Sequence, residues 1–353
     1  MPLPRTLPRA RTPDPMEAPS LRWGVLGTGW IAEQFCSALR RNTTQRIVAV
    51  GSRTQESADR AAATLGAERA HGSYQSLVAD DEVDVVYVAT PHNFHHPHAL
   101  LAMRAGKHVL VEKPMALNAA LARELADEAA ARSVFCMEAF WSFFLPKFDV
   151  LAQLLDDGVI GDLRTVLADH GQTFPADHRI LRADLAGGPM LDLMTYPAGL
   201  AQWLLGTPRE VLARATWLPE GVPGQTSILL RTDNDEQALL HSAVQDLTPT
   251  TASIGGTEGS IWLAGDFYTP GDFTVRSADG QTLTYTEPKV AHDALFWQAT
   301  ELARRVTAGE LGSPLRPLQA TIATLEIMDA ARAQIGEVFA EERADPCQSA
   351  AEG

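Results

Sequence analysis

The sequence predicts an α/β protein in which a parallel sheet covered by helices precedes an α/β domain on a predominantly antiparallel, open sheet. Up to residue 140, short apolar strands alternate with helical segments, whereas beyond it strand candidates follow one another with little helix between them. The 353 residues also suffice for two domains of ~150 residues each. We expect flexible tails over 1–20 and 341–353 and domains over 21–140 and 141–340.

The first domain is expected to open with a βαβ unit. Residues 23–26 form an apolar run followed by glycine, residues 30–39 have helical spacing, and residues 46–50 are apolar again. Further short strands and alanine-rich helices follow this unit, with strands expected at 83–89, 108–111 and 134–137 and helices near 99–104 and 119–131.

The second domain is expected to begin with helices near 148–157 and 190–205. Strand candidates with little helix between them then follow, at 211–218, 226–231, 237–244, 251–255 and 260–263. Helices near 291–307 and 318–335 close the domain.

The composition argues against several classes of partner. Lys and Arg number 29 against 44 Asp and Glu, a formal net charge of −15, so a nucleic-acid backbone would be repelled. No apolar run reaches the ~20 residues that span a bilayer, and residues 1–20 lack the apolar core of a secretory signal. The three cysteines lack metal-binding or disulfide spacing. We expect a cytoplasmic protein that binds neither nucleic acid nor a membrane.

A G-x-G-x-x-A motif follows the first expected strand and opens the first helix. Gly27 permits the tight turn, Gly29 lets a pyrophosphate approach the backbone, and Ala32 lets the helix pack closely on the sheet. Free N–H groups at the helix start would hold the phosphates. We therefore expect a dinucleotide to contact Gly27, Thr28, Gly29, Trp30 and Ile31.

The choice between NAD and NADP is made at the end of the second strand, where NAD-binding proteins carry an acidic residue for the ribose 2′-OH. This chain has Gly51-Ser52-Arg53-Thr54 there, without a carboxylate. Ser52 and Arg53 would hold a 2′-phosphate through charge-assisted hydrogen bonds, so NADP is the expected cofactor. Alternatively, Arg53 is a solvated loop residue and the cofactor is NAD.

The third motif carries a resemblance to a known family. It consists of T-P-H-N-F-H at 90–95 and A-G-K-H-V-L-V-E-K-P at 105–114, which places Lys113 at the carboxyl end of a strand, where open α/β sheets bind ligands. From about residue 21 to 335 the chain resembles the glucose-fructose oxidoreductase, inositol dehydrogenase and MocA family. The run M-E-A-F-W at 137–141 is most similar to the dimeric dihydrodiol dehydrogenases and aldose dehydrogenases of that family.

The resemblance implies a Rossmann domain followed by a largely antiparallel α/β domain, and an enzyme that uses NADP. It implies that Lys113 contacts substrate and nicotinamide, that Tyr196 accepts a proton and that Trp141 lines the substrate pocket. Family members are often dimers or tetramers, and a sheet with one face free of helices would favour association, so we expect a homodimer or homotetramer. Further cofactor contacts are expected from Thr90, Pro91, Asn93, His95 and Glu112.

Two positions depart from the family pattern. Relatives often carry Arg where this chain has Phe143, two residues after the aromatic at 141. A third glycine usually follows Gly187-Gly188, where this chain has Pro189.

Asp192 and Tyr196 form a second group of candidate catalytic residues. They are four residues apart in an expected helix, so they would share one face. A phenol is a poor base, but the Lys113 ammonium would lower its pKa, and Asp192 would orient Lys113 or bind a substrate hydroxyl. Alternatively, Asp192 caps the helix and Tyr196 is a half-buried core aromatic.

Four histidines between residues 92 and 98 do not predict a metal site. No acidic residue lies among them, and Pro97 predicts that a helix begins there, so His92 and His95 would lie in the preceding loop. We expect a loop at the edge of the cofactor instead. The pair Asp169-His170 and the loop 177–179 are within reach of a pocket, although solvated residues are the simpler interpretation.

These observations predict an NADP(H)-dependent oxidoreductase that transfers hydride between the nicotinamide and a hydroxyl or carbonyl carbon of a sugar, polyol or cyclic diol. The alternative is a non-catalytic NAD(P)-binding regulator or sensor with the same fold. Such proteins would be expected to lose the lysine of E-K-P, which this chain retains as Lys113.

Overall fold

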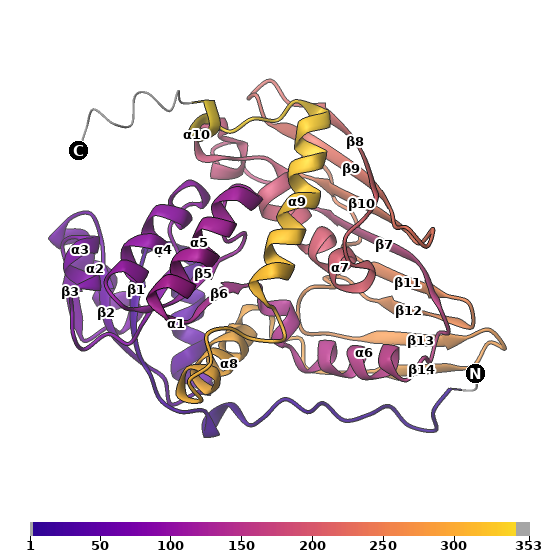
Figure 1. The fold of residues 1–353 in the computed structure, drawn as a ribbon, viewed down its shortest axis with the longest axis horizontal. Coiled ribbons are helices and arrows are strands. Elements are labelled where there is room, and N and C mark those ends of the chain that lie inside the picture. The colour runs from indigo at the N-terminus through magenta and orange to yellow at the C-terminus, as the bar shows by residue number, and fades with distance from the viewer. Residues whose placement is uncertain (1–2, 344–353) are drawn as a thin grey trace.

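The computed structural model describes residues 3–343 and contains two sheets of different character (Figure 1). The first has six parallel strands in the order β3-β2-β1-β4-β5-β6. The second has eight strands in the order β14-β13-β12-β11-β7-β10-β9-β8, antiparallel except where β7 pairs with β10. The predicted fold class is therefore confirmed.

The first sheet has the strand order of a Rossmann fold, whose ligand crevice lies where the order reverses, between β1 and β4. Strands β1, β2, β4, β5 and β6 are mostly apolar and almost fully buried because helices cover both faces, whereas the short edge strand β3 is half-buried. The strands are β1 Arg22–Leu26, β2 Arg46–Gly51, β3 Arg69–His71, β4 Val85–Val88, β5 His108–Glu112 and β6 Cys136–Ala139. The helices are α1 Trp30–Asn42, α2 Gln55–Leu65, α3 Tyr74–Val78, α4 His95–Arg104 and α5 Ala119–Arg132.

The second sheet packs one face against helices and leaves the other without a helix in the described part of the chain (Figure 1). Burial alternates along β10, where Ala238 and Leu240 are buried and Leu239 is exposed. β13 and β14 extend this sheet beyond the strands that the sequence predicted. The strands are β7 Leu163–Gly171, β8 Glu210–Trp217, β9 Pro223–Arg231, β10 Gln237–Ala243, β11 Ala252–Gly256, β12 Gly259–Leu263, β13 Phe273–Ser277 and β14 Thr282–Tyr285.

Helices α7 and α9 lie between the two sheets (Figure 1). A buried ion pair fixes the start of α9 to the first sheet, because Glu138 on β6 accepts hydrogen bonds from Arg316 (2.9 Å) and Thr321 (2.8 Å). The remaining helices are α6 Pro146–Asp156, α7 Thr195–Leu205, α8 Phe296–Thr307, α9 Leu318–Ile335 and α10 Ala340–Arg343. Short 3₁₀ turns cover Pro15–Glu17, His92–Phe94, Trp141–Phe144, Arg179–Leu181, Ala183–Leu185 and Ala291–Leu295.

Two local expectations are corrected. The helix expected from residue 190 begins as a π-helix over Met190–Met194 before α7, so Asp192 and Tyr196 are not on one face of a regular α-helix. Helix α4 begins at His95, two residues before Pro97, because proline is tolerated in the first turn of a helix.

The segments expected to be tails make specific contacts where they are described. Arg11 forms an ion pair with Asp149 of α6 (2.7 Å), and Arg304 of α8 donates to the carbonyl of Asp14 (2.5 Å). At the other end α10, over Ala340–Arg343, extends into the expected tail, while residues 344–353 of that expectation lie outside the described residues. Among residues 3–343 no helix is long and apolar enough to cross a membrane.

Candidate active site

The turn after β1 leaves space for a phosphate group. Gly27 has φ +103°, and a Cβ there would lie 2.4 Å from the carbonyl oxygen of Ala89. A Cβ on Gly29, which precedes α1, would have no atom within 4 Å. The space beside Gly29, where α1 begins with Trp30 and Ile31, is therefore open, as dinucleotide binding at a helix N-terminus requires. These residues fit the expected cofactor.

Among the residues that follow β2, Arg53 is a cation without a partner in the described part of the chain. Ser52 is buried and its N–H donates to the carbonyl of His71 (3.1 Å). Arg53 is exposed, and its guanidinium makes no hydrogen bond or ion pair with any residue in 3–343. Thr54 accepts a hydrogen bond from the N–H of Ser57 and so caps α2. The free Arg53 guanidinium suits a phosphate better than a ribose hydroxyl.

His95 joins the loops that follow β4 and β5. Its Nδ1 lies 2.8 Å from the carbonyl oxygen of Pro114, and its Nε2 lies 2.7 Å from that of Thr90. Burial lowers the pKa of His95 to about 4, so at pH 7 the ring is neutral and donates a hydrogen bond to only one of these two carbonyl oxygens. Because both nitrogens face carbonyl oxygens, His95 holds the loop in place and has no nitrogen free for the substrate.

The other predicted residues of these loops have separate partners. Thr90 shares a hydrogen bond with His98 (3.0 Å), and Asn93 donates to Glu341 of α10 (2.8 Å). Pro91 precedes the 3₁₀ turn His92–Phe94. Glu112 is buried, accepts from the Tyr87 hydroxyl (2.5 Å) and from the N–H of Lys113 (3.1 Å), and has a pKa that burial raises to about 7. Glu112 thus fixes the backbone of Lys113.

The structure brings Lys113, Asp192 and Tyr196 together. The Lys113 ammonium donates to the Asp192 side chain (Oδ1, 3.1 Å) and to its carbonyl oxygen (3.0 Å). The same Nζ lies 5.1 Å from the centroid of the Tyr196 ring. Asp192 therefore orients Lys113 and does not cap a helix.

Asp192 lies between two cations, Lys113 and Arg179, and a buried histidine, His92, whose own pKa burial lowers well below its usual value. Arg179 lies 2.8 Å from Oδ2 as an ion pair, and His92 Nε2 lies 3.8 Å from Oδ1. Burial alone would raise the pKa of Asp192, but Lys113, His92 and Arg179 outweigh it and hold that pKa well below its usual range. The carboxylate is thus charged at every pH at which the protein would be assayed.

The pKa of Tyr196 differs from the expectation. The Tyr196 oxygen accepts a hydrogen bond from the Trp141 indole N–H (3.2 Å), and the side chain is buried. Burial raises the pKa of Tyr196 above its usual value, and Glu112 and Asp192 add to that increase. The predicted lowering by Lys113 is wrong for the protein without ligands, because the ammonium lies over the ring and its charge is paired with Asp192.

Three aromatic residues of the site were not assigned from the sequence. Tyr268 stacks on Tyr196 with 4.0 Å between ring centroids, and His170 of β7 lies 4.8 Å from Tyr268. His292 stacks on Trp141 at 5.4 Å. His170 was noted as within reach of a pocket, but no spacing signal distinguishes it from a solvated residue.

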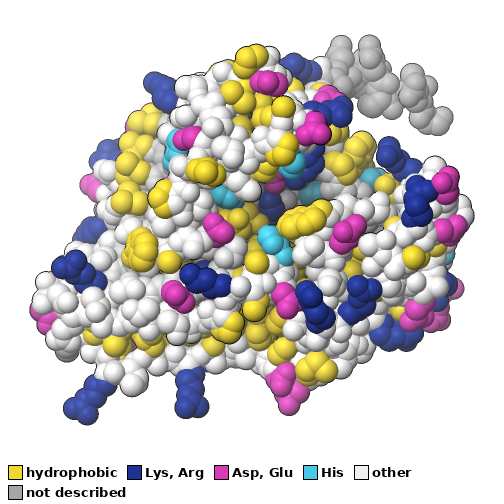
Figure 2. All heavy atoms as spheres, turned by 180° about the vertical axis from the view of Figure 1, so that it is seen from behind, with side chains coloured by type: hydrophobic (Ala, Val, Ile, Leu, Met, Phe, Trp, Pro, Cys, Tyr) yellow, Lys and Arg dark blue, Asp and Glu magenta, His cyan; other side chains and the backbone are white. Residues whose placement is uncertain are grey.

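The histidines between residues 92 and 98 point to different partners. His96 binds Glu124 (3.0 Å) on α5, whereas His92 faces Asp192. Within residues 3–343 no three His, Cys, Asp or Glu side chains are grouped so that they could hold a metal ion. Figure 2 shows histidine and basic side chains gathered around a hollow near the middle of one face of the molecule.

Phe143, where relatives often carry Arg, belongs to the core. Its ring centroid lies 5.7 Å from that of Phe148 and 5.9 Å from that of Trp203. The Arg316 guanidinium lies 5.0 Å from the Phe143 ring. The arginine that contacts this part of the core is therefore Arg316, which is distant from Phe143 in the sequence.

Comparison with known proteins agrees with this geometry. Residues 21–140 match the model of an oxidoreductase family with an NAD-binding Rossmann fold, and residues 148–262 match the GFO/IDH/MocA C-terminal domain. The chain is 31% identical over 335 residues to trans-1,2-dihydrobenzene-1,2-diol dehydrogenase of Mus musculus, which covers 92% of this chain and 99% of that protein. It is 33% identical over 378 residues to D-xylose 1-dehydrogenase (NADP(+)) of Hypocrea jecorina, covering 91% and 94%.

Solved structures show the same architecture. A 3-ketoreductase from Actinomadura kijaniata, in complex with NADP and TDP-benzene, has a TM-score of 0.80 and 28% identity over 90% of this chain and 98% of its own. Levoglucosan dehydrogenase in complex with NADH and levoglucosan has a TM-score of 0.80 at 21% identity, over 90% of this chain and 97% of its own, which shows a shared fold. The chain belongs to the Gfo/Idh/MocA family of oxidoreductases.

Proposed function

We propose that the chain transfers hydride between NADP(H) and a hydroxyl or carbonyl carbon of a sugar, polyol or cyclic diol. The observation that carries this proposal is the grouping of Lys113, Asp192 and Tyr196 at the carboxyl end of β5. As a member of its family the chain is an NAD(P)-dependent oxidoreductase acting on CH–OH groups. The relatives named above are dehydrogenases of a diol and of a sugar, which supports the substrate class.

Lys113, Tyr196 and Trp141 have different roles at the reacting oxygen of the substrate. Lys113, oriented by Asp192, donates a hydrogen bond to that oxygen. Tyr196 exchanges a proton with it, and the Trp141 N–H stabilises the phenolate when Tyr196 is deprotonated. The stacked rings of Tyr196 and Tyr268 exclude water from this region. The nicotinamide, when bound, supplies or accepts the hydride.

NADP is the proposed cofactor because Arg53 has no partner among the described residues and no carboxylate occupies positions 51–54. One sugar dehydrogenase relative is named for NADP(+), and the similar ketoreductase was crystallised with NADP. A charged, unpaired guanidinium at the end of β2 favours the 2′-phosphate over the 2′-hydroxyl. Gly27 to Ile31 would hold the diphosphate in either cofactor.

The test is an initial-rate screen with D-xylose, myo-inositol and trans-cyclohexane-1,2-diol as substrates and NADP⁺ as oxidant. We expect turnover by the wild type, loss of turnover in Lys113→Met, and unchanged NADPH binding in that variant. Lys289→Met is the matched control, because it removes the same charge from an exposed loop residue. A Lys113→Met protein that keeps most of its kcat would contradict the assigned role. A wild type that binds NADPH and turns over nothing would favour a regulator.

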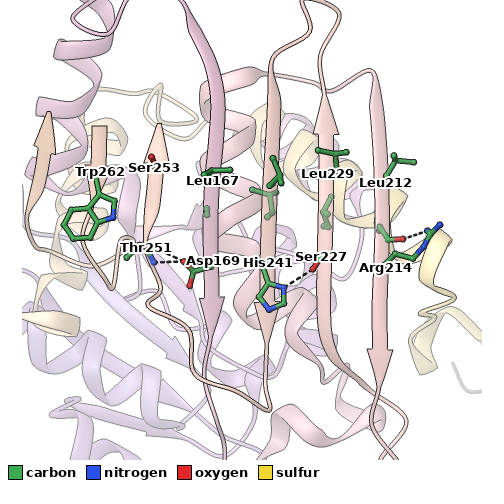
Figure 3. A pocket seen from close by; sticks show the side chains of 15 residues that line it. Leu167, Asp169, Leu212, Arg214, Ser227, Leu229, His241, Thr251, Ser253 and Trp262 are labelled. Atoms are coloured by element: carbon green, nitrogen blue, oxygen red, sulfur yellow. Dashed lines mark hydrogen bonds between the residues drawn. The ribbon is translucent and has the colours of Figure 1, made fainter. Parts of the chain in front are cut away.

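We also propose that the helix-free face of the second sheet binds a second copy of the chain. Leucines and a tryptophan on this face are 36–50% exposed and border a hollow of about 780 Å³ (Figure 3). Eight strands spaced ~4.8 Å apart and about 20 Å long offer about 700 Å² on one face, close to the roughly 800 Å² per partner of a stable interface. A two-fold axis would bring the same residues of both copies together. The exposed apolar residues are Leu167, Leu212, Leu229, Leu239 and Trp262.

A further inference from the structure

Arg179 is the outermost of the charged groups around Asp192. Its side chain is 43% exposed, whereas the side chains of Lys113 and Asp192 are 14% and 12% exposed. Its guanidinium forms an ion pair with Asp192 Oδ2, and it donates no hydrogen bond to any residue within 3–343. The N–H donors of Arg179 that do not face Asp192 are therefore available to a ligand beside that carboxylate.

The backbone fixes the position of Arg179 relative to Asp192. Arg179 begins a 3₁₀ turn whose next residue, Ile180, is fully buried. The carbonyl of Ile180 accepts from the N–H of Gly188 (2.6 Å), two residues before the π-helix that carries Asp192. The turn and the helix thus form one connected unit, so the guanidinium is held beside the carboxylate.

We propose that Arg179 positions Asp192 and binds a second oxygen of the substrate, next to the oxygen that Lys113 holds. This inference deepens the proposed function and rests on it. The substrates it selects carry an oxygen on the carbon adjacent to the reacting carbon, as vicinal diols and sugars do.

The charges around the carboxylate support this assignment. Lys113 contacts Oδ1 and Arg179 contacts Oδ2, so an ammonium and a guanidinium lie on the two oxygens of one carboxylate. Two cations against one anion leave an excess of positive charge that attracts substrate oxygens. A guanidinium offers five N–H donors in a fixed plane, so it can hold Asp192 and a substrate oxygen at the same time. A lysine at position 179 would keep the charge without that geometry.

The competing interpretation is that Arg179 only fastens its loop to Asp192. In that case its loss would affect all substrates equally. If instead it binds the neighbouring oxygen, its loss would affect only substrates that have that oxygen. Two pairs of compounds separate these cases: D-xylose with 2-deoxy-D-xylose, and trans-cyclohexane-1,2-diol with cyclohexanol.

The experiment measures kcat and KM for both pairs in the wild type, Arg179→Met and Arg179→Lys. We expect Arg179→Met to lower kcat/KM roughly tenfold or more for D-xylose and the diol, mostly through KM, and less than twofold for the deoxy partners. Arg182→Met is the matched control, because Arg182 lies in the same loop and pairs with Asp184 outside the site. Unchanged NADPH affinity verifies that each variant is folded. Equal losses with both members of each pair would overturn the proposal.

The pH profile gives a second measurement. Asp192 is faced by the cations Lys113 and Arg179 and by His92, whose own pKa burial lowers well below its usual value, and removing one of the two cations raises the pKa of the Asp192 carboxyl group. Because Asp192 is charged throughout the assay range in the wild type, kcat/KM should show no acid limb from this group, whereas Arg179→Met should lose kcat/KM at the acid end of the range and Arg179→Lys should not. Arg179→Lys should nevertheless lose the preference for vicinal oxygens. An acid end of the profile that is the same in Arg179→Met and the wild type would contradict the positioning role.

The failure of the proposed function can be told apart from the failure of this inference. If the wild type turns over none of the four compounds, the proposed function is wrong, and calorimetry with the NADP⁺-loaded protein decides about Arg179. Tighter binding of D-xylose and the diol than of their partners, lost in Arg179→Met and kept in Arg182→Met, supports the inference. A wild type that shows no such preference overturns it.

Discussion

At the scale of single residues, the cofactor preference depends on Arg53. We expect Arg53→Ala to weaken NADP binding roughly tenfold or more, because one charge-assisted hydrogen bond contributes ~1.5–3 kcal/mol. NAD binding should stay nearly unchanged, since the 2′-hydroxyl carries no charge. Dissociation constants for both cofactors, measured by titration of the wild type and the variant, check this. Equal affinity of the wild type for NAD and NADP would refute it.

Tyr196 is the residue whose removal should separate chemistry from packing. Tyr196→Phe is expected to lower the rate by ~10²–10⁴, because a positioned acid or base contributes about that factor. The Trp141 N–H then loses its acceptor, so the free energy of unfolding should fall by about 1–3 kcal/mol. Initial rates where hydride transfer limits turnover, together with urea denaturation, measure both effects. An unchanged rate would remove Tyr196 from the mechanism.

The raised pKa of Tyr196 also predicts how the rates of carbonyl reduction and alcohol oxidation change with pH. The hydroxyl is protonated at neutral pH, so carbonyl reduction, in which it gives up a proton, starts from the correct state. Alcohol oxidation needs the phenolate, so its rate should rise with pH through the alkaline range. Rates of carbonyl reduction and of alcohol oxidation, measured across pH 6–10, test this prediction. A single pH optimum shared by the two reactions would contradict it.

At the scale of elements, the turn from β1 to α1 tolerates only glycine at position 27. A Cβ there meets the Ala89 carbonyl oxygen at 2.4 Å, and φ is +103°. Gly27→Ala is expected to cost about 3 kcal/mol of stability and to weaken binding of both cofactors. Gly106→Ala is the control, because Gly106 also has a positive φ but no atom near its Cβ position, and it should cost about 1 kcal/mol. Similar melting temperatures of the two variants would contradict this account.

The secondary-structure elements also show which features of the fold and of the site can be predicted from the sequence. The glycine motif, the E-K-P lysine and most strands were predicted because each depends on neighbours along the chain. His170 and Tyr268 were not assigned, because they reach Tyr196 from β7 and from a loop about 100 residues apart, and no local pattern encodes that contact. The π-helix was missed for a related reason, since the ion pair that holds Asp192 comes from distant parts of the chain.

At the scale of the whole molecule, the proposed association through the open sheet face can be tested by a single substitution. Leu229→Asp, on β9 next to the edge strand β8, is expected to shift the proposed dimer to monomer, because it would bury an unpaired carboxylate in the apolar interface of each copy. Leu247→Asp is the control, because Leu247 is 75% exposed and lies outside the strands. Sedimentation velocity measures the outcome. A Leu229→Asp protein with the same sedimentation coefficient as the wild type would exclude this face as the interface.

Strand β7 connects that face to the reacting centre through the alternation of its side chains. Asp169 lies on the open face, where it accepts from the N–H groups of Thr250 and Thr251, while the next residue, His170, packs beside Tyr196 (Figure 3). A ligand that displaces His170 therefore also moves the backbone of the face that we propose to bind a second copy of the chain. If that face forms the dimer, ligand binding and association share a coupling free energy, which is reciprocal. Substrate affinity is expected to depend on protein concentration over the range in which the dimer dissociates.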